Sequence, residues 1–345
     1  MKKLFVSVIT VAIAAASLSA RPEGQTVTVV DRPADRRVDV TIGGKPFTSY
    51  IYPTTLQKPV LYPIRSASGA EVTRGYPLEP KPGERADHPH HVGHWFNYGD
   101  VNGLDFWGHS NATRAENKPR MGTIVHKEIT KVAGGNDRGE LAARADWSAA
   151  DGSIVLREQT RFVFSGAAGR RVIDRTTTWT AADKPVTFKD TKEGAFGIRV
   201  ARALDHPQKG AEVLVGPNGG NETVKRVEAP GVTTGSYIGS DGKTGEAVWG
   251  TRGPWMGLTG TIDGKPVTVA ILDHSSNHGH PTYWHARGYG LFAANPLGRQ
   301  GYDPKQEPAS LTLQPGQALT FQHRILVLDR QLTREELQKE HANFY

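Results

Sequence analysis

Two short histidine-rich windows hold most of the side chains in this chain that could do chemistry. Residues 87–107 read DHPHHVGHWFNYGDVNGLDFW, and residues 273–296 read DHSSNHGHPTYWHARGYGLFAANP. Eight of the thirteen histidines lie in these two windows, about 180 residues apart. An imidazole can act as a general acid or base, and it ligates Zn, Cu, Ni or Fe through one ring nitrogen. We therefore expect the fold to bring both windows into one polar site.

A metal ion is one reading of these histidines. The candidate ligands are His90, His91 and His274, and the candidate cofactor is one divalent metal, Zn, Cu or another. The spacing does not follow a metal motif such as HExxH. A histidine set without cysteine accepts Cu(II) or Zn(II) and does not choose between them. A polar ligand site without a metal and a purely structural loop remain the alternatives.

Three residues are candidates for catalytic proton transfer: Asp105, Glu193 and His285. Asp105 belongs to the first window and His285 to the second. Glu193 lies in the stretch KEGAFGIRV (192–200), just before an expected strand. A carboxylate at the mouth of a strand acts as a general acid or base when its pKa is raised. A structural ion pair of Glu193 is the alternative.

Aromatic and amide side chains accompany both windows. An apolar ring beside hydrogen-bonding groups suits a sugar, which has an apolar C–H face and a rim of hydroxyls. Arg287 shares a face with His285 along an extended segment and suits a planar partner such as a carboxylate, with a structural Asp as the alternative partner. The candidate substrate-binding residues are Asn97, Trp95, Arg199, Trp284 and Arg287.

The elements that position these residues are expected to be β-strands. Period-two alternation runs through residues 26–31, 37–52, 120–202 and 257–274, with turn compositions between the alternating segments. Three dipeptides predict hairpins: Gly43-Gly44, Asp263-Gly264 and Pro315-Gly316.

Irregular structure is expected elsewhere. The density of Pro and Gly in residues 65–93 places the first window on a loop or a loop-to-strand junction, where binding residues usually sit. Residues 203–248 are expected to be mostly loop. A short helix is expected over residues 334–342, with Thr333 as its cap.

The fold class expected is therefore all-β: a large antiparallel β-sandwich of the galactose-mutarotase-like supersandwich type, with little helix. A closed barrel is the alternative. Residues 21–345 are expected to form a single large sandwich domain, with two smaller domains as the alternative.

The N-terminus has the order of a secretory signal peptide. Lys2 and Lys3 precede an apolar run from Leu4 to Ala16 and small residues up to Ala20, which predicts a signal peptide at residues 1–20. The run is shorter than the about 20 residues that span a bilayer, although an uncleaved anchor is the alternative. The predicted location is periplasmic or extracellular. The chain has no cysteine, which excludes disulfides and a lipid-bearing cysteine.

Charge and motifs narrow the partners. The formal net charge of +7 falls to +5 without Lys2 and Lys3, and it is spread over the chain without a block of like charges. We therefore expect no nucleic-acid partner and, after signal cleavage, no membrane partner. No GxSxG elbow, P-loop or GxGxxG motif is present. The expected partner is a small-molecule or oligosaccharide ligand, and the oligomeric state stays open.

Both windows and the stretch KEGAFGIRV resemble secreted bacterial proteins of the PmoA family, which carries a methane-oxygenase-like label and is also treated as domain of unknown function 6807. The resemblance covers most of the mature chain. A membrane methane monooxygenase subunit needs transmembrane helices, and no apolar run after residue 20 is long enough for one, so the label does not fit. The resemblance implies a β-sandwich protein of carbohydrate-degrading bacteria.

The function predicted is a secreted carbohydrate-active enzyme, a glycoside hydrolase or lyase, with a histidine-rich site. A non-catalytic sandwich that binds a sugar or a metal is the first alternative. Copper-dependent oxidation, which rests on the histidine count and the family label, is the second.

Overall fold

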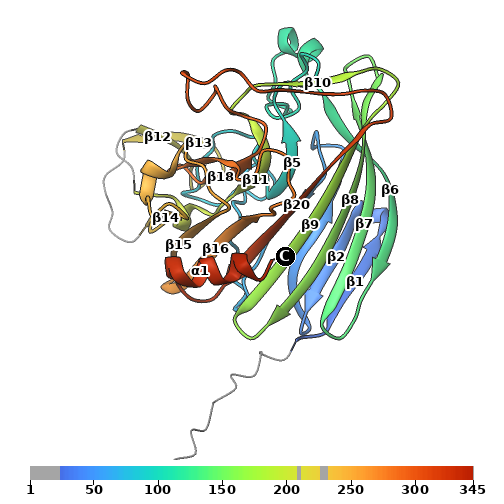
Figure 1. Ribbon diagram of the computed structural model, residues 1–345. Helices are drawn as coiled ribbons and strands as arrows, with labels where there is room; N and C mark the ends of the chain where they lie inside the picture. Colours follow the sequence, from blue (N-terminus) through green and yellow to red (C-terminus); the bar gives the residue numbers. More distant parts are fainter. Residues whose placement is uncertain (1–23, 208–210, 226–231, 345) are drawn as a thin grey trace, which may run out of the picture.

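The computed structural model describes residues 24–207, 211–225 and 232–344, so the predicted signal peptide lies outside the described residues. Two eight-stranded antiparallel sheets pack face to face (Figure 1). In spatial order the first sheet holds β1 (Val27–Arg32), β2 (Arg37–Ile42), β3 (Lys45–Ile51), β4 (Val60–Leu61), β5 (His94–Tyr98), β11 (Gly194–Arg199), β18 (Leu291–Asn295) and β17 (Tyr283–Arg287). The second holds β14 (Ser236–Gly239), β15 (Trp255–Ile262), β16 (Lys265–Asp273), β20 (Ala318–Leu328), β9 (Arg170–Ala181), β8 (Ile154–Ala167), β7 (Arg138–Ser148) and β6 (Thr123–Ala133).

Smaller elements complete the fold. Two ribbons pair β10 (Val186–Lys189) with β19 (Ser310–Leu313) and β12 (Ala211–Val215) with β13 (Asn221–Lys225). Short 3-10 helices cover Pro33–Asp35, Ala115–Arg120, Arg202–Leu204 and Gly245–Val248. The α-helix α1 (Arg334–Ala342) begins at a capping box, in which Thr333 and Glu336 each accept the backbone N–H of the other. The helix predicted from the sequence is confirmed.

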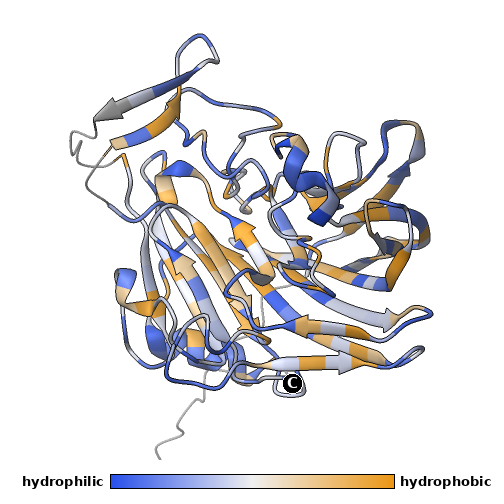
Figure 2. Ribbon diagram, turned by 90° about the horizontal axis from the view of Figure 1, so that it is seen from above, coloured by the Kyte–Doolittle hydropathy of each residue, from blue (hydrophilic) through white to orange (hydrophobic). Residues whose placement is uncertain are grey.

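The hydrophobic core lies between the two sheets. Alternate residues of each strand point inward, so that the ring of Phe96 on β5 packs 4.8 Å from that of Trp179 on β9. Figure 2 shows hydrophobic residues concentrated on the strands, whereas the connecting loops are mainly hydrophilic. The predicted large antiparallel sandwich with little helix is confirmed. No helix among the described residues is long and apolar enough to cross a membrane.

Two of the three predicted hairpins are confirmed. Gly43-Gly44 joins β2 to β3, and Asp263-Gly264 joins β15 to β16 with the positive φ angles, 50° and 74°, that a tight hairpin turn requires. The hairpin predicted at Pro315-Gly316 is wrong, because β19 pairs with β10 while β20 pairs with β9 and β16. The chain does reverse there, but the turn leads from one sheet into another.

The segment predicted to be mostly loop contains more strand than expected. Residues 216–220 reverse the chain between β12 and β13, and β14 joins the edge of the second sheet. The alternation in this segment is short and broken by glycine, which hid the strands. In contrast, the first histidine window lies where predicted, in a loop that ends at β5.

Candidate functional site

Four neighbouring strands of the first sheet carry the site on the face turned away from the core. Trp95, Gly197, Ala293 and His285 stand in one register across β5, β11, β18 and β17. Glycine and alanine in the middle leave the sheet surface low, and the Trp95 ring lies over Gly197 so closely that a Cβ there would come within 2.5 Å of it. The sheet therefore forms a floor between an indole and an imidazole that belong to different windows.

Aromatic rings stand on this floor in a continuous stack. Nearly parallel rings follow one another from Tyr289 to His88 (4.9 Å between centroids), to His91 (4.9 Å) and to Trp95 (5.2 Å). Trp107 stands edge-on to Trp95 at 5.3 Å and parallel to His285 at 6.3 Å. We call this group the aromatic–histidine site. It comprises His88, His90, His91, Trp95, Trp107, Glu193, His285 and Tyr289.

A buried ion network fixes one end of the stack. The Asp87 carboxylate accepts hydrogen bonds from Arg74 at 2.7 Å and from Arg199 at 2.5 Å, and both guanidinium groups are buried. Burial alone would raise the pKa of Asp87, but a hydrogen bond from His88 and the two arginine charges hold it well below its usual range. His88 adopts the left-handed backbone conformation with φ +42°, and Arg74 donates to its carbonyl at 3.1 Å. Such strain gathers at functional sites.

Two of the predicted catalytic residues form a pair. The Nδ1 atom of His285 lies 4.0 Å from Oε2 of Glu193, whose carboxylate also pairs with Lys192 and is 32% exposed. Burial, together with the charges of Lys192 and Arg287, lowers the pKa of His285 to about 3. The imidazole is therefore neutral at neutral pH and can accept a proton.

The third predicted catalytic residue, Asp105, is held by backbone groups. One carboxylate oxygen accepts the N–H groups of Trp107 and Gly108, each at 2.8 Å. Burial raises the pKa of Asp105 despite these two hydrogen bonds, and the charge of Glu193 raises it further. The charges of Asp105 and Glu193 therefore interact. The pKa of Asp105 is raised, and the Glu193 carboxylate is partly exposed to solvent.

Lys58 belongs to this region, and the sequence contained no signal for it. Its buried ammonium donates to the carbonyl of His90 at 2.8 Å and lies 5.6 Å from the centre of the Trp95 ring. Burial lowers the pKa of Lys58 to about 7, although the charge of Asp105 opposes the shift. Lys58 and His90 also line a cavity of about 560 Å³. A single lysine beside a two-residue strand has no spacing that would reveal it.

Several buried polar atoms of the site lack a protein partner. Within the described ranges, no hydrogen bond reaches Nε2 of His91, Nε1 of Trp95, Nε of Arg199 or Oδ1 of Asn97. The amide nitrogen of Asn97 is occupied, since it donates to the carbonyl of Phe106 at 2.6 Å. An unpaired buried polar atom costs about 1–3 kcal/mol. Such atoms beside stacked rings indicate groups that a polar ligand would satisfy.

Of the predicted substrate-binding residues, Trp284 lies away from the site, whereas Arg287 lies at the edge of the site beside Tyr289. Trp284 is on the core side of β17, is buried, and donates to the carbonyl of Gly253 at 3.1 Å. Its placement at the site is corrected, because successive residues of a strand point to opposite faces and His285 takes the outer face. Arg287 is exposed on the outer face, with its guanidinium 5.5 Å from the Trp249 ring and 5.9 Å from the Tyr289 ring.

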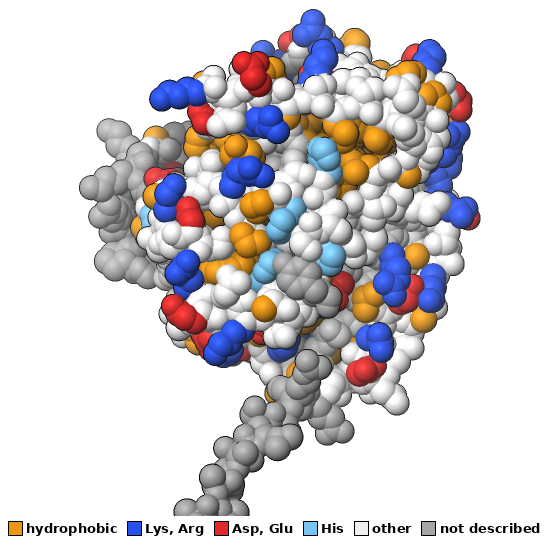
Figure 3. Space-filling view, in the orientation of Figure 1, with side chains coloured by type: hydrophobic (Ala, Val, Ile, Leu, Met, Phe, Trp, Pro, Cys, Tyr) orange, Lys and Arg blue, Asp and Glu red, His pale blue; other side chains and the backbone are white. Residues whose placement is uncertain are grey.

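The second window divides between two places. Asp273, at the end of β16, accepts hydrogen bonds from Asn277 at 2.7 Å and His280 at 2.8 Å, and lies 3.4 Å from Nε2 of His323. We call this group, with the neighbouring helix residue, the Asp273 cluster. It comprises Asp273, His274, Asn277, His280, His323 and His341. Figure 3 shows histidine side chains gathered near the middle of the face that carries α1.

The three predicted metal ligands are not assembled. His90 and His91 lie side by side with their ring centroids 4.3 Å apart, whereas the His274 ring bonds Ser276 at 2.7 Å and stands edge-on to Phe344. His274 follows a strand of the second sheet, and the other two precede a strand of the first. Over residues 24–207, 211–225 and 232–344, no group of three or more His, Asp or Glu side chains is placed to hold one ion.

Comparison with known proteins places the chain in a family. A sequence profile described as "Family of unknown function (DUF6807)" matches residues 37–342, which confirms that part of the resemblance and leaves the PmoA label outside it. No curated protein sequence matches the chain.

Solved structures are similar to this chain at low identity and low TM-score. GH36 α-galactosidase AgaB from Geobacillus stearothermophilus is similar over 88% of this chain and 41% of its own, with 9% identity and a TM-score of 0.40. A galactose 1-epimerase from Lactobacillus acidophilus NCFM is similar over 90% of this chain and all of its own, with 10% identity and a TM-score of 0.38. A putative aldose 1-epimerase from Escherichia coli K12 is similar over 88% of this chain and 99% of its own, with 9% identity and a TM-score of 0.33. This chain thus spans about two-fifths of the α-galactosidase.

Proposed function

We propose a function for this chain, which belongs to the DUF6807 family of unknown function, from the chemistry of its aromatic–histidine site. The proposed function is that of a secreted carbohydrate-active enzyme, a hydrolase or lyase that acts on a glycoside. The observation that carries the proposal is the group of buried polar atoms that have no partner among the described residues, at a site built from stacked rings.

A sugar satisfies both features of the site at once. Its hydroxyl groups donate to Oδ1 of Asn97, and they donate to or accept from Nε2 of His91 according to the tautomer of that ring. Its apolar C–H face packs against aromatic rings such as that of Trp107. A purely apolar ligand would leave the buried nitrogens unsatisfied, and a purely ionic one would not use the rings.

The proton-transfer residues suit acid–base catalysis. His285, which is neutral in the resting site, is the candidate base for water in a hydrolase or for a sugar C–H in a lyase, and its low pKa means that it needs a negative charge beside it to hold the proton. Glu193, 4.0 Å away, stabilises the imidazolium that forms. Asp105, whose pKa burial raises, is the candidate acid for the leaving oxygen.

Substitution of the pair tests this mechanism. Glu193→Gln and His285→Gln are each expected to lower turnover of an active oligosaccharide, found by screening neutral and acidic substrates, by about 10²–10⁴-fold. Glu128→Gln is the matched control, because Glu128 pairs with Arg144 on the exposed part of the other sheet. A new ultraviolet absorbance from a carbon–carbon double bond identifies a lyase, and ¹⁸O incorporation from labelled water identifies a hydrolase. Unchanged turnover in both variants would contradict the assignment.

A non-catalytic sugar-binding protein is the second candidate, favoured by the ring stack from Tyr289 to Trp95, which needs no proton transfer to bind a sugar. Saturable sugar binding by the wild type, with no product from any bound oligosaccharide, would select this candidate.

A divalent metal at His90 and His91 is a separate proposal. The two rings are adjacent, and a Zn or Cu ion held there would polarise a carbonyl or activate water, or in the copper case support oxidation. Elemental analysis of the wild type and of His90→Ala tests it: one equivalent of metal that is lost in the variant supports the ion, and no metal after reconstitution opposes it.

Export is also proposed, on the signal-like order of residues 1–20. The mass of the protein recovered from the periplasm or the medium should match a chain cleaved between Ala16 and Arg21. A full-length mass in the cell interior would contradict export.

A further inference from the structure

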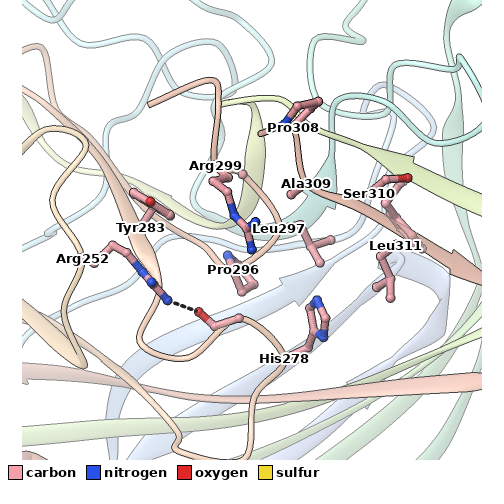
Figure 4. Close-up of a pocket in the computed structure, with 13 residues that line it drawn as sticks. Arg252, His278, Tyr283, Pro296, Leu297, Arg299, Pro308, Ala309, Ser310 and Leu311 are labelled. Carbon is pink, nitrogen blue, oxygen red and sulfur yellow. Dashed lines mark hydrogen bonds between the residues drawn. The ribbon is translucent and has the colours of Figure 1, made fainter. Parts of the chain in front are cut away.

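A second cavity lies beyond the aromatic–histidine site, on the side of β17 where Tyr283 precedes His285. Its volume is about 480 Å³, and it is formed by loops around Gly279, Leu297 and Pro308 together with Phe188 of β10. We call it the Arg252 pocket. Figure 4 shows Arg252, Arg299 and His278 directed toward the same space from three sides.

The two charged side chains that line this pocket, Arg252 and Arg299, are both positive. Arg252, Arg299 and His278 line it, and none of its lining residues is an Asp or a Glu. Neither arginine forms an ion pair with any residue that the structure describes. The nearby carboxylate of Asp190 faces the chain, since it accepts the backbone N–H groups of Arg299, Gln300, Gly301 and Ala309.

Arg252 is held in place without loss of its charge. Its Nε donates to the carbonyl of Pro281 at 3.0 Å and its Nη2 to that of Gly279 at 3.2 Å. The guanidinium also lies 5.1 Å from the Tyr283 ring, which is itself stacked on Tyr302 at 5.1 Å. A guanidinium fixed by neutral carbonyls keeps its positive charge and its remaining N–H groups for an anion.

The buried ring of Tyr302 lies between the pocket and the aromatic–histidine site. The Tyr302 ring lies 6.1 Å from that of His285, and Tyr283 shares the outer face of β17 with His285. Apolar side chains, Leu297 and Leu311 among them, line the rest of the cavity. A saccharide in this cavity would therefore meet both apolar side chains and two cations.

We propose that the Arg252 pocket binds an anionic substituent, a carboxylate or a sulfate, on the sugar ligand of this protein. The inference rests on the proposed function and deepens it, because it makes the substrate an acidic saccharide. The sugar ring contacts the apolar lining, and the oxyanion accepts hydrogen bonds from Arg252 and Arg299.

Binding measurements on the intact protein test the proposal with D-glucuronate, glucose 6-sulfate and D-glucose as probes. The wild type is expected to bind at least one anionic probe ten or more times more tightly than glucose. Arg252→Gln and Arg299→Gln are expected to abolish this preference. Arg330→Gln is the control, because it removes the same charge from an exposed arginine that pairs with Glu336 beside α1. Which anionic probe binds more tightly distinguishes a carboxylate from a sulfate.

Three results would overturn the inference: no saturable binding of either anionic probe, equal affinity for glucose, or a preference that survives both pocket substitutions. The outcome is separable from that of the proposed enzyme activity. Glu193→Gln leaves the pocket intact, so the anion preference is expected to persist in that variant whether or not the wild type turns a substrate over. Loss of the preference in Glu193→Gln but not in the arginine variants would place the anion at the aromatic–histidine site instead.

Discussion

In the Asp273 cluster a buried carboxylate accepts hydrogen bonds from His280 and Asn277, whereas in the aromatic–histidine site several buried atoms meet no partner among the described residues. Within the cluster, Nε2 of His323, 3.4 Å from that carboxylate, also lacks a hydrogen bond. The two groups share a residue type and one sequence window, yet their chemistry differs. Satisfied buried groups stabilise a fold, and unsatisfied ones destabilise it until a ligand arrives. The comparison teaches that histidine density alone does not mark a functional site. What the ring nitrogens contact does.

The largest effect is expected from removal of the buried carboxylate of the Asp273 cluster. Asp273→Ala is expected to lower the free energy of unfolding by about 3–5 kcal/mol, because it removes the buried acceptor shared by Asn277, His280 and the buried N–H group of Thr282. Denaturant unfolding at pH 7 measures the loss. Asp174→Ala is the control, since Asp174 pairs with Arg324 at the partly exposed surface of the same sheet and should cost about 1 kcal/mol or less. Equal losses in the two variants would remove the special status of the cluster.

Acid is expected to affect the two groups in different pH ranges. Burial lowers the pKa of His285 to about 3 and that of His90 to about 2, so the folded protein keeps these rings neutral while an unfolded chain protonates them near pH 6.5. Their contribution is complete above about pH 6.5. It falls as the pH drops toward 3, by up to about 1.4 kcal/mol per pH unit for each ring.

The Asp273 carboxylate itself should resist acid longer. Burial would raise the pKa of Asp273, but hydrogen bonds from His280, His323 and Asn277 outweigh it and lower the pKa to about 2, so its stabilisation is lost only as the pH falls toward that value. Unfolding measured at pH 7, 5.5 and 4.5 tests the order. His285→Gln should flatten the dependence, and His278→Gln, at an exposed ring, should not. A dependence that His285→Gln leaves as steep as in the wild type would contradict the assignment.

The sequence predicted the strands, two hairpins, α1 and the loop that carries the first window, because each of these depends on local composition and period. The structure brings Glu193 to 4.0 Å from His285 and close enough to Asp105 to raise its pKa, while the catalytic roles predicted for these three residues stay predictions. The sequence could not predict that the second window divides between the two sheets. His274 follows β16 of one sheet and His285 lies on β17 of the other, and no local pattern states which sheet the next strand joins.

Two other differences between the sequence prediction and the structure, the wrong placement of Trp284 and the absence of Lys58 from the prediction, have different causes. The core position of Trp284 could have been deduced, since strict alternation opposes it to His285. The position of Lys58 could not, because only tertiary packing buries an ordinary lysine beside Trp95 and Asp105.

A smaller effect is expected when the same substitution, His to Phe, is made at His91, which has an unpartnered ring nitrogen, and at His94, which has none. His91→Phe keeps the aromatic stack and removes the Nε2 atom that has no protein partner, and it gives up only the long contact of Nδ1 with Arg199 at 3.4 Å. It is therefore expected to raise the free energy of unfolding by about 1 kcal/mol and to weaken sugar binding about tenfold. His94→Phe is the matched control. Its ring nitrogens are occupied by the carbonyl of Gly197 at 2.9 Å and by Arg175 at 3.2 Å, so the same change should lower stability instead. The same sign of change in both variants would mean that the unpartnered nitrogen has no energetic meaning.

The smallest effect is expected at His274, the histidine that the sequence placed with His90 and His91. Its ring is partly exposed at the surface beside Ser276 and Phe344, so His274→Ala should change the free energy of unfolding by no more than about 0.5 kcal/mol. Sugar affinity and any metal content should stay as in the wild type, whereas His90→Ala should alter the affinity, because His90 stands against His91 at the site. Calorimetry and elemental analysis on both variants measure these quantities. An equal loss of metal in His274→Ala and His90→Ala would mean that both histidines hold the same ion. The distinction between a structural and a functional histidine cluster would then be wrong.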